Sequence, residues 1–368
     1  MSYKELFYFT GHCLALDEHP EFRERVIELI QAEGTDLENF VQLCSDHLVI
    51  PAIYLKLKAH NLLSVIPEEV VQVFAEIYDL NRERNLQILQ QIDDITSQLN
   101  KEKIQPVFLK GTANLLDGLY SDVGERMIGD IDFLVKEEDY LKTGLLLEAA
   151  GYKKPANNYF DVFRFKHYPP LTKDGEPAYI EIHRLPVDQK YDASLNSELI
   201  FSQKKEVPGK PGLFVPSDVH KLIHTFIHSQ LADNGHTYKQ ADFRGLNDLY
   251  RISKRINVSE LANQTGYPHQ ANSWFAIGQR LLGLHGRFCP KESRLVQWYC
   301  WKYDWSLSHF NAYIIYTSLK KLVHTVFMRY GMGFLQMLYS KKQRISVYKR
   351  LKDPKWYRIH VLSLRENF

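Results

Sequence analysis

Hydrophobic positions recur at helical spacing over about the first hundred residues. In PEFRERVIELIQAEG (20–34) and DLENFVQLCSDHLV (36–49), apolar side chains return every three or four positions, which predicts amphipathic helices. The stretch 67–103 keeps this spacing without a break. Because it opens on Pro67, a residue favoured in the first turn of a helix, we predict one long helix there.

The pattern changes at about residue 104, where short apolar segments replace the long amphipathic ones. These segments predict strands in PVFLKG (106–111), DIDFLVK (130–136), DVFRFKHY (161–168) and AYIEIHR (178–184). Helices are predicted in TANLLDGLY (112–120) and in EEDYLKTGLLLEAAGY (137–152), which has an acidic first turn and stops near Gly151. This order of elements is typical of an α+β (mixed α/β) domain with a small mixed sheet.

Helical spacing returns after Pro216. Ser217 is placed to cap a helix over 218–232, and FRGLNDLY (243–250) predicts a helix that packs against the mixed domain. The predicted division of the chain is an N-terminal helical region over 1–100, a mixed domain over 101–215, and a C-terminal helical region with a basic tail over 216–368.

Composition is that of an ordinary globular protein. Apolar residues make up 45% and charged residues 24% of the 368 positions, which argues against long disordered segments. The formal net charge of +2 gives no reason to expect nucleic-acid binding by the whole protein. From Ser318 onward, however, twelve Lys and Arg stand against two Asp and Glu, a local net of +10 that leaves −8 for the rest.

The cysteine spacing and the search for targeting signals argue against several classes of site and segment. Cys13, Cys44, Cys289 and Cys300 lie far apart without a C-x-x-C pair, which argues against a zinc site and a disulfide framework. The N-terminus lacks the apolar core of a signal peptide, and no run of ~18 apolar residues predicts a membrane span. We therefore expect a cytoplasmic protein.

Two carboxylates interrupt one of the predicted strands. Asp130 and Asp132 flank Ile131, and residues two apart in a strand share a face, so both side chains project together while Ile131, Phe133 and Val135 face the other way. Two like charges this close resist burial unless a cation joins them. Carboxylates suit Mg²⁺, and two such ions can serve phosphoryl transfer. The alternative is an edge strand with a solvated face.

Two neighbouring features favour the metal. Glu181 places a third acid between Ile180 and Ile182, whose side chains would face away from it. The Lys110-Gly111-Thr112 turn joins a strand to a helix, where backbone N–H groups and the lysine attract phosphate.

The order of these elements resembles the nucleotidyltransferase superfamily related to DNA polymerase β. More narrowly, LKGTANLLDGLYSDVGERMIGDIDFLV with IEIHR resembles the bacterial family of uncharacterised nucleotidyltransferases, whose pattern is LKG…R…DiDlLv…(D/E)lH. The match covers about residues 104–185. The sequence departs from the broad superfamily in the lysine before the glycine, in threonine for the commoner serine, in a longer gap before the paired acids, and in glutamate as third acid.

The resemblance implies roles for individual residues. Asp130 and Asp132 would hold Mg²⁺, with two ions expected, and Glu181 would be the third acid and metal ligand. Lys110, Gly111 and Thr112 would hold the triphosphate of an NTP. Arg126 matches the family's arginine, either contacting phosphate or lying on a surface loop, and His183 either orients the substrate or third acid or is a plain hydrogen-bonded histidine.

The implied reaction is Mg²⁺-dependent transfer of a nucleoside monophosphate from an NTP to an acceptor, with release of pyrophosphate. The acceptor (small molecule, peptide, saccharide or RNA) stays open. Two alternatives remain: a non-catalytic nucleotide sensor or scaffold, and an enzyme that modifies transfer RNA or another RNA. In the second, the basic segment 341–368 would contact RNA. That segment can also contact an anionic surface, or be a solvated helix.

Three further sets of polar residues have plainer interpretations. His220, His224 and His228 share a helical face, and with no acidic or cysteine partner in range we favour an interface or core role over a metal site or a substrate wall. For Asn81, Arg84 and Asn85 we favour a solvated helix surface over a cleft floor. Contact of Asp242 and Asp248 with the acceptor has little support in the sequence.

Overall fold

The computed structural model describes residues 1–18, 20–32, 37–155, 166–327, 337–341, 344–345, 348–349 and 352–353. It divides into two compact units, Met1–Ser308 and His309–Phe368. The predicted strand over 161–168 lies mostly outside the described residues, as does most of the basic segment 341–368. The predicted division at residues 100 and 215 stays a prediction.

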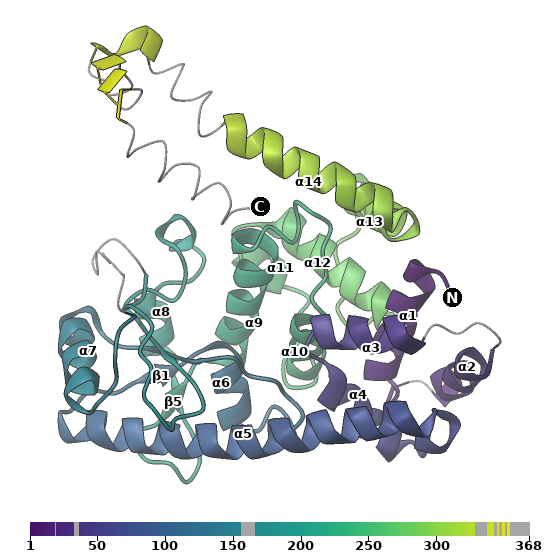
Figure 1. The fold of residues 1–368 in the computed structure, drawn as a ribbon, viewed down its shortest axis with the longest axis horizontal. Coiled ribbons are helices and arrows are strands. Elements are labelled where there is room, and N and C mark those ends of the chain that lie inside the picture. The colour runs from purple at the N-terminus through teal and green to yellow at the C-terminus, as the bar shows by residue number, and fades with distance from the viewer. Residues whose placement is uncertain are drawn as a thin grey trace. The chain divides into compact units, whose positions relative to one another are not determined.

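The first unit holds most of the secondary structure (Figure 1). Its N-terminal helices are α1 (Tyr3–Leu14), α2 (Pro20–Gln31), α3 (Leu37–Asp46), α4 (Ile50–Ala59), the short η1 (Leu63–Val65) and α5 (Glu68–Lys101). The mixed part consists of β1 (Val107–Phe108), α6 (Lys110–Leu116), β2 (Ile131–Leu134), η2 (Glu137–Asp139), α7 (Tyr140–Ala149), β3 (Ile180–His183), η3 (Gln189–Tyr191), α8 (Ser197–Ser202), β4 (Lys205–Glu206) and β5 (Phe214–Val215). The remaining helices are α9 (Asp218–Phe226), the π-helix η4 (Ile227–Ala232), α10 (Phe243–Ile252), α11 (Leu261–Gln264), α12 (Pro268–Leu281) and α13 (Arg294–Ser308).

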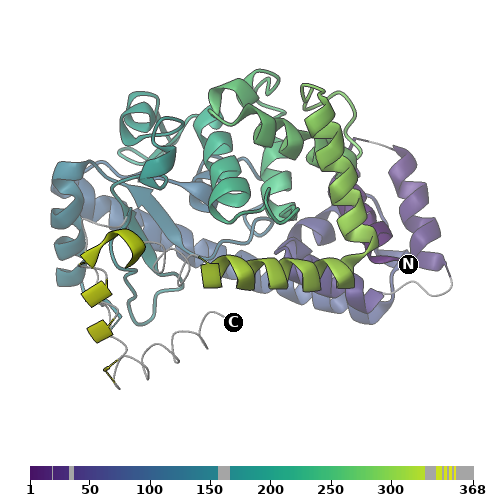
Figure 2. The same ribbon diagram turned by 90° about the horizontal axis from the view of Figure 1, so that it is seen from above.

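The long helix α5 contributes to both hydrophobic cores of the first unit. It runs for 34 residues from its N-cap Pro67, which confirms the predicted helix and gives it a length of about 50 Å. Near its start, Phe74 packs into the core of the surrounding helices. Farther along, Ile88, Ile92 and Ile95 pack into a second core under the sheet. Figures 1 and 2 both show α5 spanning the helices and the sheet of this unit.

The sheet confirms the predicted α+β class. Its strand order is β3-β2-β1-β5-β4, with parallel β2–β3 and β1–β5 pairs and antiparallel β1–β2 and β4–β5 pairs. One face turns its apolar side chains into the core that α5 covers, and these include Ile131, Phe133, Val135, Ile180 and Ile182 as predicted. The alternating side chains, among them Asp132, are thereby directed to the other face.

The second unit contains α14 (Phe310–Val326). Within the described residues, no helix is long and apolar enough to cross a membrane. All four cysteines are free, and only Cys289 is exposed.

The prediction of a solvated surface for Asn81, Arg84 and Asn85 was wrong. Asn81 and Asn85 are 5% and 0% exposed. Asn81 Nδ2 donates to Gly124 O (2.7 Å), and Asn85 Nδ2 donates to Val123 O (2.6 Å) and Arg126 O (2.8 Å).

Arg84 extends the same anchorage to residues just before β2 and just before β3. Its guanidinium donates to Ile128 O, to Gly129 O (3.0 Å) and to Pro177 O (3.3 Å). Because the loop that precedes β2 has no strand partner, these side chains of α5 satisfy its carbonyl groups instead.

We expect Asn85→Ala to lower the free energy of unfolding by about 2 to 4 kcal/mol, because it leaves one buried and one partly buried carbonyl without their donor. Denaturant titration measures this loss. Gln87→Ala is the matched control, since Gln87 is exposed on the same helix and its loss should change stability by less than about 0.5 kcal/mol. Equal stability of the two variants would contradict the anchoring role.

Candidate active site

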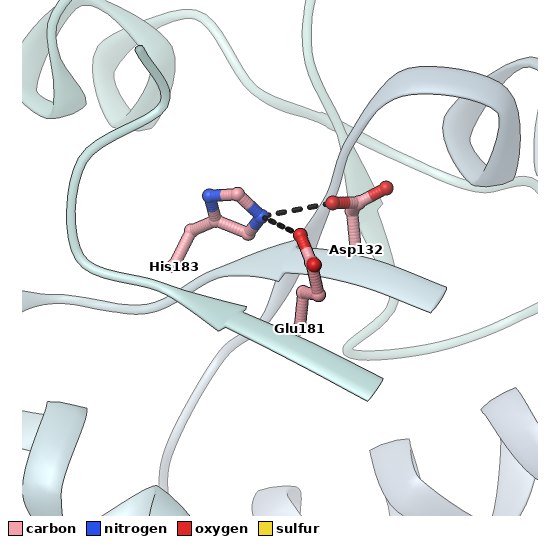
Figure 3. Close-up of side chains that lie close together, drawn as sticks. All are labelled: Asp132, Glu181 and His183. Atoms are coloured by element: carbon pink, nitrogen blue, oxygen red, sulfur yellow. Dashed lines mark hydrogen bonds and ion pairs between the residues drawn. The ribbon is translucent and has the colours of Figure 1, made fainter. Parts of the chain in front are cut away.

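Strand register brings the acidic residues together. In the parallel β2–β3 pair, Asp132 lies opposite Glu181 and Leu134 opposite His183. Asp132, Glu181 and His183 therefore project from the same sheet face, as Figure 3 shows. Asp132 is 1% exposed and His183 is fully buried, whereas Glu181 is partly exposed.

The three side chains form a tight polar cluster. His183 Nε2 lies 2.8 Å from Asp132 Oδ1 and 3.5 Å from Glu181 Oε2. On the other side of the ring, Nδ1 lies 3.3 Å from Leu185 O, which fixes the ring orientation. One ligand atom from each of the three residues lies within 4.8 Å of the others, a spacing that suits a metal ion. His183 thus lies beside Glu181 on the same sheet face, and its predicted role in orienting the substrate or the third acid stays a prediction.

Lys110 supplies the cation that these carboxylates face. Its Nζ lies 2.6 Å from Asp132 Oδ1 and 3.8 Å from Glu181 Oε2. The lysine starts α6 with a φ of +52°, in the left-handed region that residues other than glycine rarely occupy. Such strain costs about 1 kcal/mol or more and persists where the surroundings fix it, as at functional sites.

The acids experience different environments. Burial raises the pKa of Asp130 to about 6, and the Asp132 carboxylate adds to the rise. Burial opposes ionisation of Asp132 as well, but Lys110 and His183 hold its pKa well below the ordinary value. The pKa of Glu181 is lowered despite burial, through its hydrogen bond with His183.

This electrostatic pattern fits a divalent cation. Asp130, Asp132 and Glu181 carry three formal negative charges when ionised, and Lys110 returns only one. The remaining two charges match those of Mg²⁺, whose ligands are hard oxygen atoms. Asp130 does not belong to the cluster of closely spaced ligand atoms, so its predicted part in metal binding stays a prediction.

Asp130 instead lines a pocket of about 170 Å³ next to the acids. One wall comes from the turn at Lys110 and from the loop before β2, and the other from α9, η4 and α10. The lining residues are Lys110, Gly111, Arg126, Ile128, Gly129, Asp130, His224, Thr225, His228, Ser229, Asp242, Arg244, Gly245 and Asp248. A pocket thus adjoins the predicted catalytic residues.

Arg126 and Thr112 both have protein partners. Arg126 Nε and Nη2 donate to the two carboxylate oxygens of Asp248 (3.0 and 2.7 Å), and Nη1 donates to Met127 O (2.6 Å). Thr112 Oγ1 donates to Asp130 O (3.1 Å). These bonds fix the loop that carries Asp130, and the predicted phosphate contacts of both side chains stay predictions.

Packing does not by itself require glycine at position 111, and the predicted phosphate contact of Gly111 stays a prediction. A Cβ atom at this position would meet the Arg126 guanidinium at 3.5 Å, an ordinary contact distance. The glycine lines the pocket directly, so its backbone is accessible from the pocket.

The histidine face of α9 is divided between core and pocket. The expected burial is confirmed for His220 and His224, at 6% and 3% exposed. The statement that no acid lies in range was wrong, since His228 Nδ1 is 3.0 Å from Asp233 Oδ2. His224 and His228 also line the pocket, which the favoured core or interface role did not include, because the four-residue spacing does not show what the face meets.

Two substitutions should have opposite effects on stability without metal at pH 7.5. Since a raised pKa in the folded state means that ionised Asp130 opposes folding above pH 6, Asp130→Asn should stabilise by about 1 to 2 kcal/mol. This gain in stability should fade as the pH falls from 6 towards 4.

Asp132→Asn should destabilise the folded protein by about 3 kcal/mol because Lys110 and His183 lose their partner. Denaturant titrations at several pH values test both, and destabilisation by Asp130→Asn would contradict the charge pattern.

Comparison with known proteins identifies the family of the chain. No curated protein matches the chain. One family model, described as uncharacterised nucleotidyltransferase, matches residues 33–271, a span that includes the acidic strands, the turn at Lys110 and both walls of the pocket. The chain therefore belongs to this family of uncharacterised nucleotidyltransferases.

Proposed function

We propose that the protein transfers a nucleoside monophosphate from an NTP to an acceptor in a Mg²⁺-dependent reaction. The observation that carries the proposal is the pairing of Asp132 with Glu181 across β2 and β3, next to Lys110 and a pocket. Family membership supports nucleotidyl transfer as the reaction class. An oxygen of the acceptor forms a bond to the α-phosphorus, the bond from that phosphorus to the oxygen bridging to the β-phosphate breaks, and pyrophosphate leaves. Where the attacking oxygen belongs to a hydroxyl group, its proton passes to water.

The surroundings of the three acids suggest their roles in holding the metal. Asp132 and Glu181 would hold Mg²⁺, with Asp130 completing the set from the edge of the pocket. Mg²⁺, when bound, neutralises phosphate charge and polarises the attacking and leaving oxygens. The lowered pKa of Glu181 makes it a weak base, which favours metal binding and positioning over proton abstraction. His183 would position Asp132 and Glu181 through Nε2.

Lys110 and Gly111 would face the phosphates. Lys110 contacts the acids through its ammonium and also lines the pocket, so it can contact a phosphate oxygen that enters beside them. Arg126, through its bond to Asp248, and Thr112, through its bond to the carbonyl of Asp130, would hold this part of the site in position. Most of the rate would come from positioning and charge stabilisation.

Activity can be tested with purified protein, Mg²⁺, each α-³²P-NTP in turn and a cell extract as the source of acceptor. We expect a labelled product and released pyrophosphate with the wild-type protein. Asp132→Asn should reduce both by at least about 100-fold, because it removes a carboxylate that would hold the metal. Asp79→Asn is the control, since Asp79 is exposed on α5.

Two results would contradict the proposal. Equal labelling by wild type and Asp132→Asn would show that these acids do not carry the reaction. NTP binding that needs no Mg²⁺ and yields no pyrophosphate, measured by calorimetry, would identify a nucleotide sensor instead.

A further inference from the structure

The helical wall of the pocket presents a cation without a partner. Arg244 is the second residue of α10, and its backbone N–H is bound by the N-cap Asp242 at 3.0 Å. Its guanidinium lines the pocket, yet it makes no hydrogen bond or ion pair with the described residues. The other two cations of the pocket differ in this respect, since Lys110 is paired with Asp132 and Arg126 with Asp248.

The Arg244 guanidinium is partly withdrawn from water without a direct ion pair. Its side chain is only partly exposed, and burial together with the nearby Arg126 lowers its pKa, while Asp242, Asp248 and Asp130 act in the opposite direction from beyond ion-pair distance. A cation that loses water without a hydrogen-bonded anion to replace it is only partly compensated. A bound oxyanion would restore the missing interaction, and the planar guanidinium suits the oxygens of phosphate in particular.

His224 is a second polar group on the same wall without a partner. It is 3% exposed, it lines the pocket, and its ring has no hydrogen bond with the described residues. Burial and the nearby Lys110 lower its pKa well below the ordinary value, so the ring is neutral at pH 7 and offers one donor and one acceptor. Nearby, Thr225 and Ser229 donate their hydroxyl protons to backbone carbonyls.

We propose that Arg244 and His224 form an oxyanion subsite that binds a phosphate group of the nucleotide from the helical side of the pocket. The subsite lines the same pocket as Lys110 and Gly111, so phosphate would be contacted both from the turn and from α9 and α10. The pocket volume of about 170 Å³ is below the ~300–1,000 Å³ of pockets that enclose a whole ligand, which fits a phosphate better than a complete nucleotide. This inference rests on the proposed function, because it takes an NTP as the ligand.

Calorimetric titration with inorganic triphosphate and with each NTP, in the presence of Mg²⁺, tests the subsite. Arg244→Gln should weaken both ligands at least about 10-fold, and Arg244→Lys, which keeps the charge but loses the fork of donors, should give an intermediate loss. His224→Gln should have a smaller effect of about 3-fold, because it removes a neutral group. Arg294→Gln is the matched control, since Arg294 is exposed at the start of α13 and should leave affinity unchanged.

The outcomes separate this inference from the proposed function. If wild type binds NTP and triphosphate, and both Arg244 variants bind as tightly as wild type, the subsite is wrong while the proposed function stands. The same holds if the Arg244 variants keep triphosphate affinity but transfer less nucleotide to the acceptor, because the anion would then belong to the acceptor. If wild type binds neither ligand, both proposals fail. Thermal unfolding of each variant shows whether a loss of affinity merely reflects a loss of fold.

Discussion

The parallel register of β2 and β3 is the constraint on which the rest of the site depends. It sets Asp132 beside Glu181 and places His183 one pleat farther along the same face. Because side chains alternate between the faces of a sheet, a slip of one residue would exchange Glu181 for Ile180 or Ile182. The apolar residues on the opposite face resist such a slip, since they fill the core over α5. Burial of hydrophobic side chains therefore holds the acids in position.

The acids are kept close at an electrostatic cost. Lys110 offsets part of the charge of Asp132 and Glu181, and its own backbone is strained in doing so. Asp130 receives less compensation, as the raised pKa of its carboxyl group shows. Sites that bind cations or stabilise reacting charges commonly retain such unfavourable arrangements, because a ligand supplies the missing interaction.

The helical elements around the sheet contribute more than support. Asp248 of α10 binds Arg126 with both carboxylate oxygens and accepts a bond from Tyr120 (2.5 Å). Arg251, one turn farther along α10, pairs with Glu125. These buried contacts tie the loop before β2 to α10, so the two walls of the pocket are fixed relative to each other. A shift of α10 would therefore also move the loop that carries Asp130, even though the two are far apart in the sequence.

Much of the architecture followed from local pattern. The period of 3.6 in the stretch 67–103 predicted α5, and short apolar segments predicted β1, β2 and β3, because burial of one face requires these periods. The acidic strands were recognisable for the same reason. Asp132 and Glu181 interrupt otherwise apolar segments. Because side chains alternate between the two faces of a strand, the sequence predicts which neighbours lie on the same face as these acids.

The sequence did not indicate which residues, distant along the chain, would form hydrogen bonds or ion pairs with these side chains. Asn85 resembled a surface residue because its partners lie in a loop 38 and 41 residues away. Nothing near Arg126 in the sequence indicated that Asp248, far along the chain, would bind its guanidinium. The pocket residues on α9 and α10, Arg244 and His224 among them, carry no local signal, because their role depends on facing the turn at Lys110. Periodicity determined the elements and the face on which the acids lie, whereas tertiary packing decided which charges are paired and which remain available for a ligand.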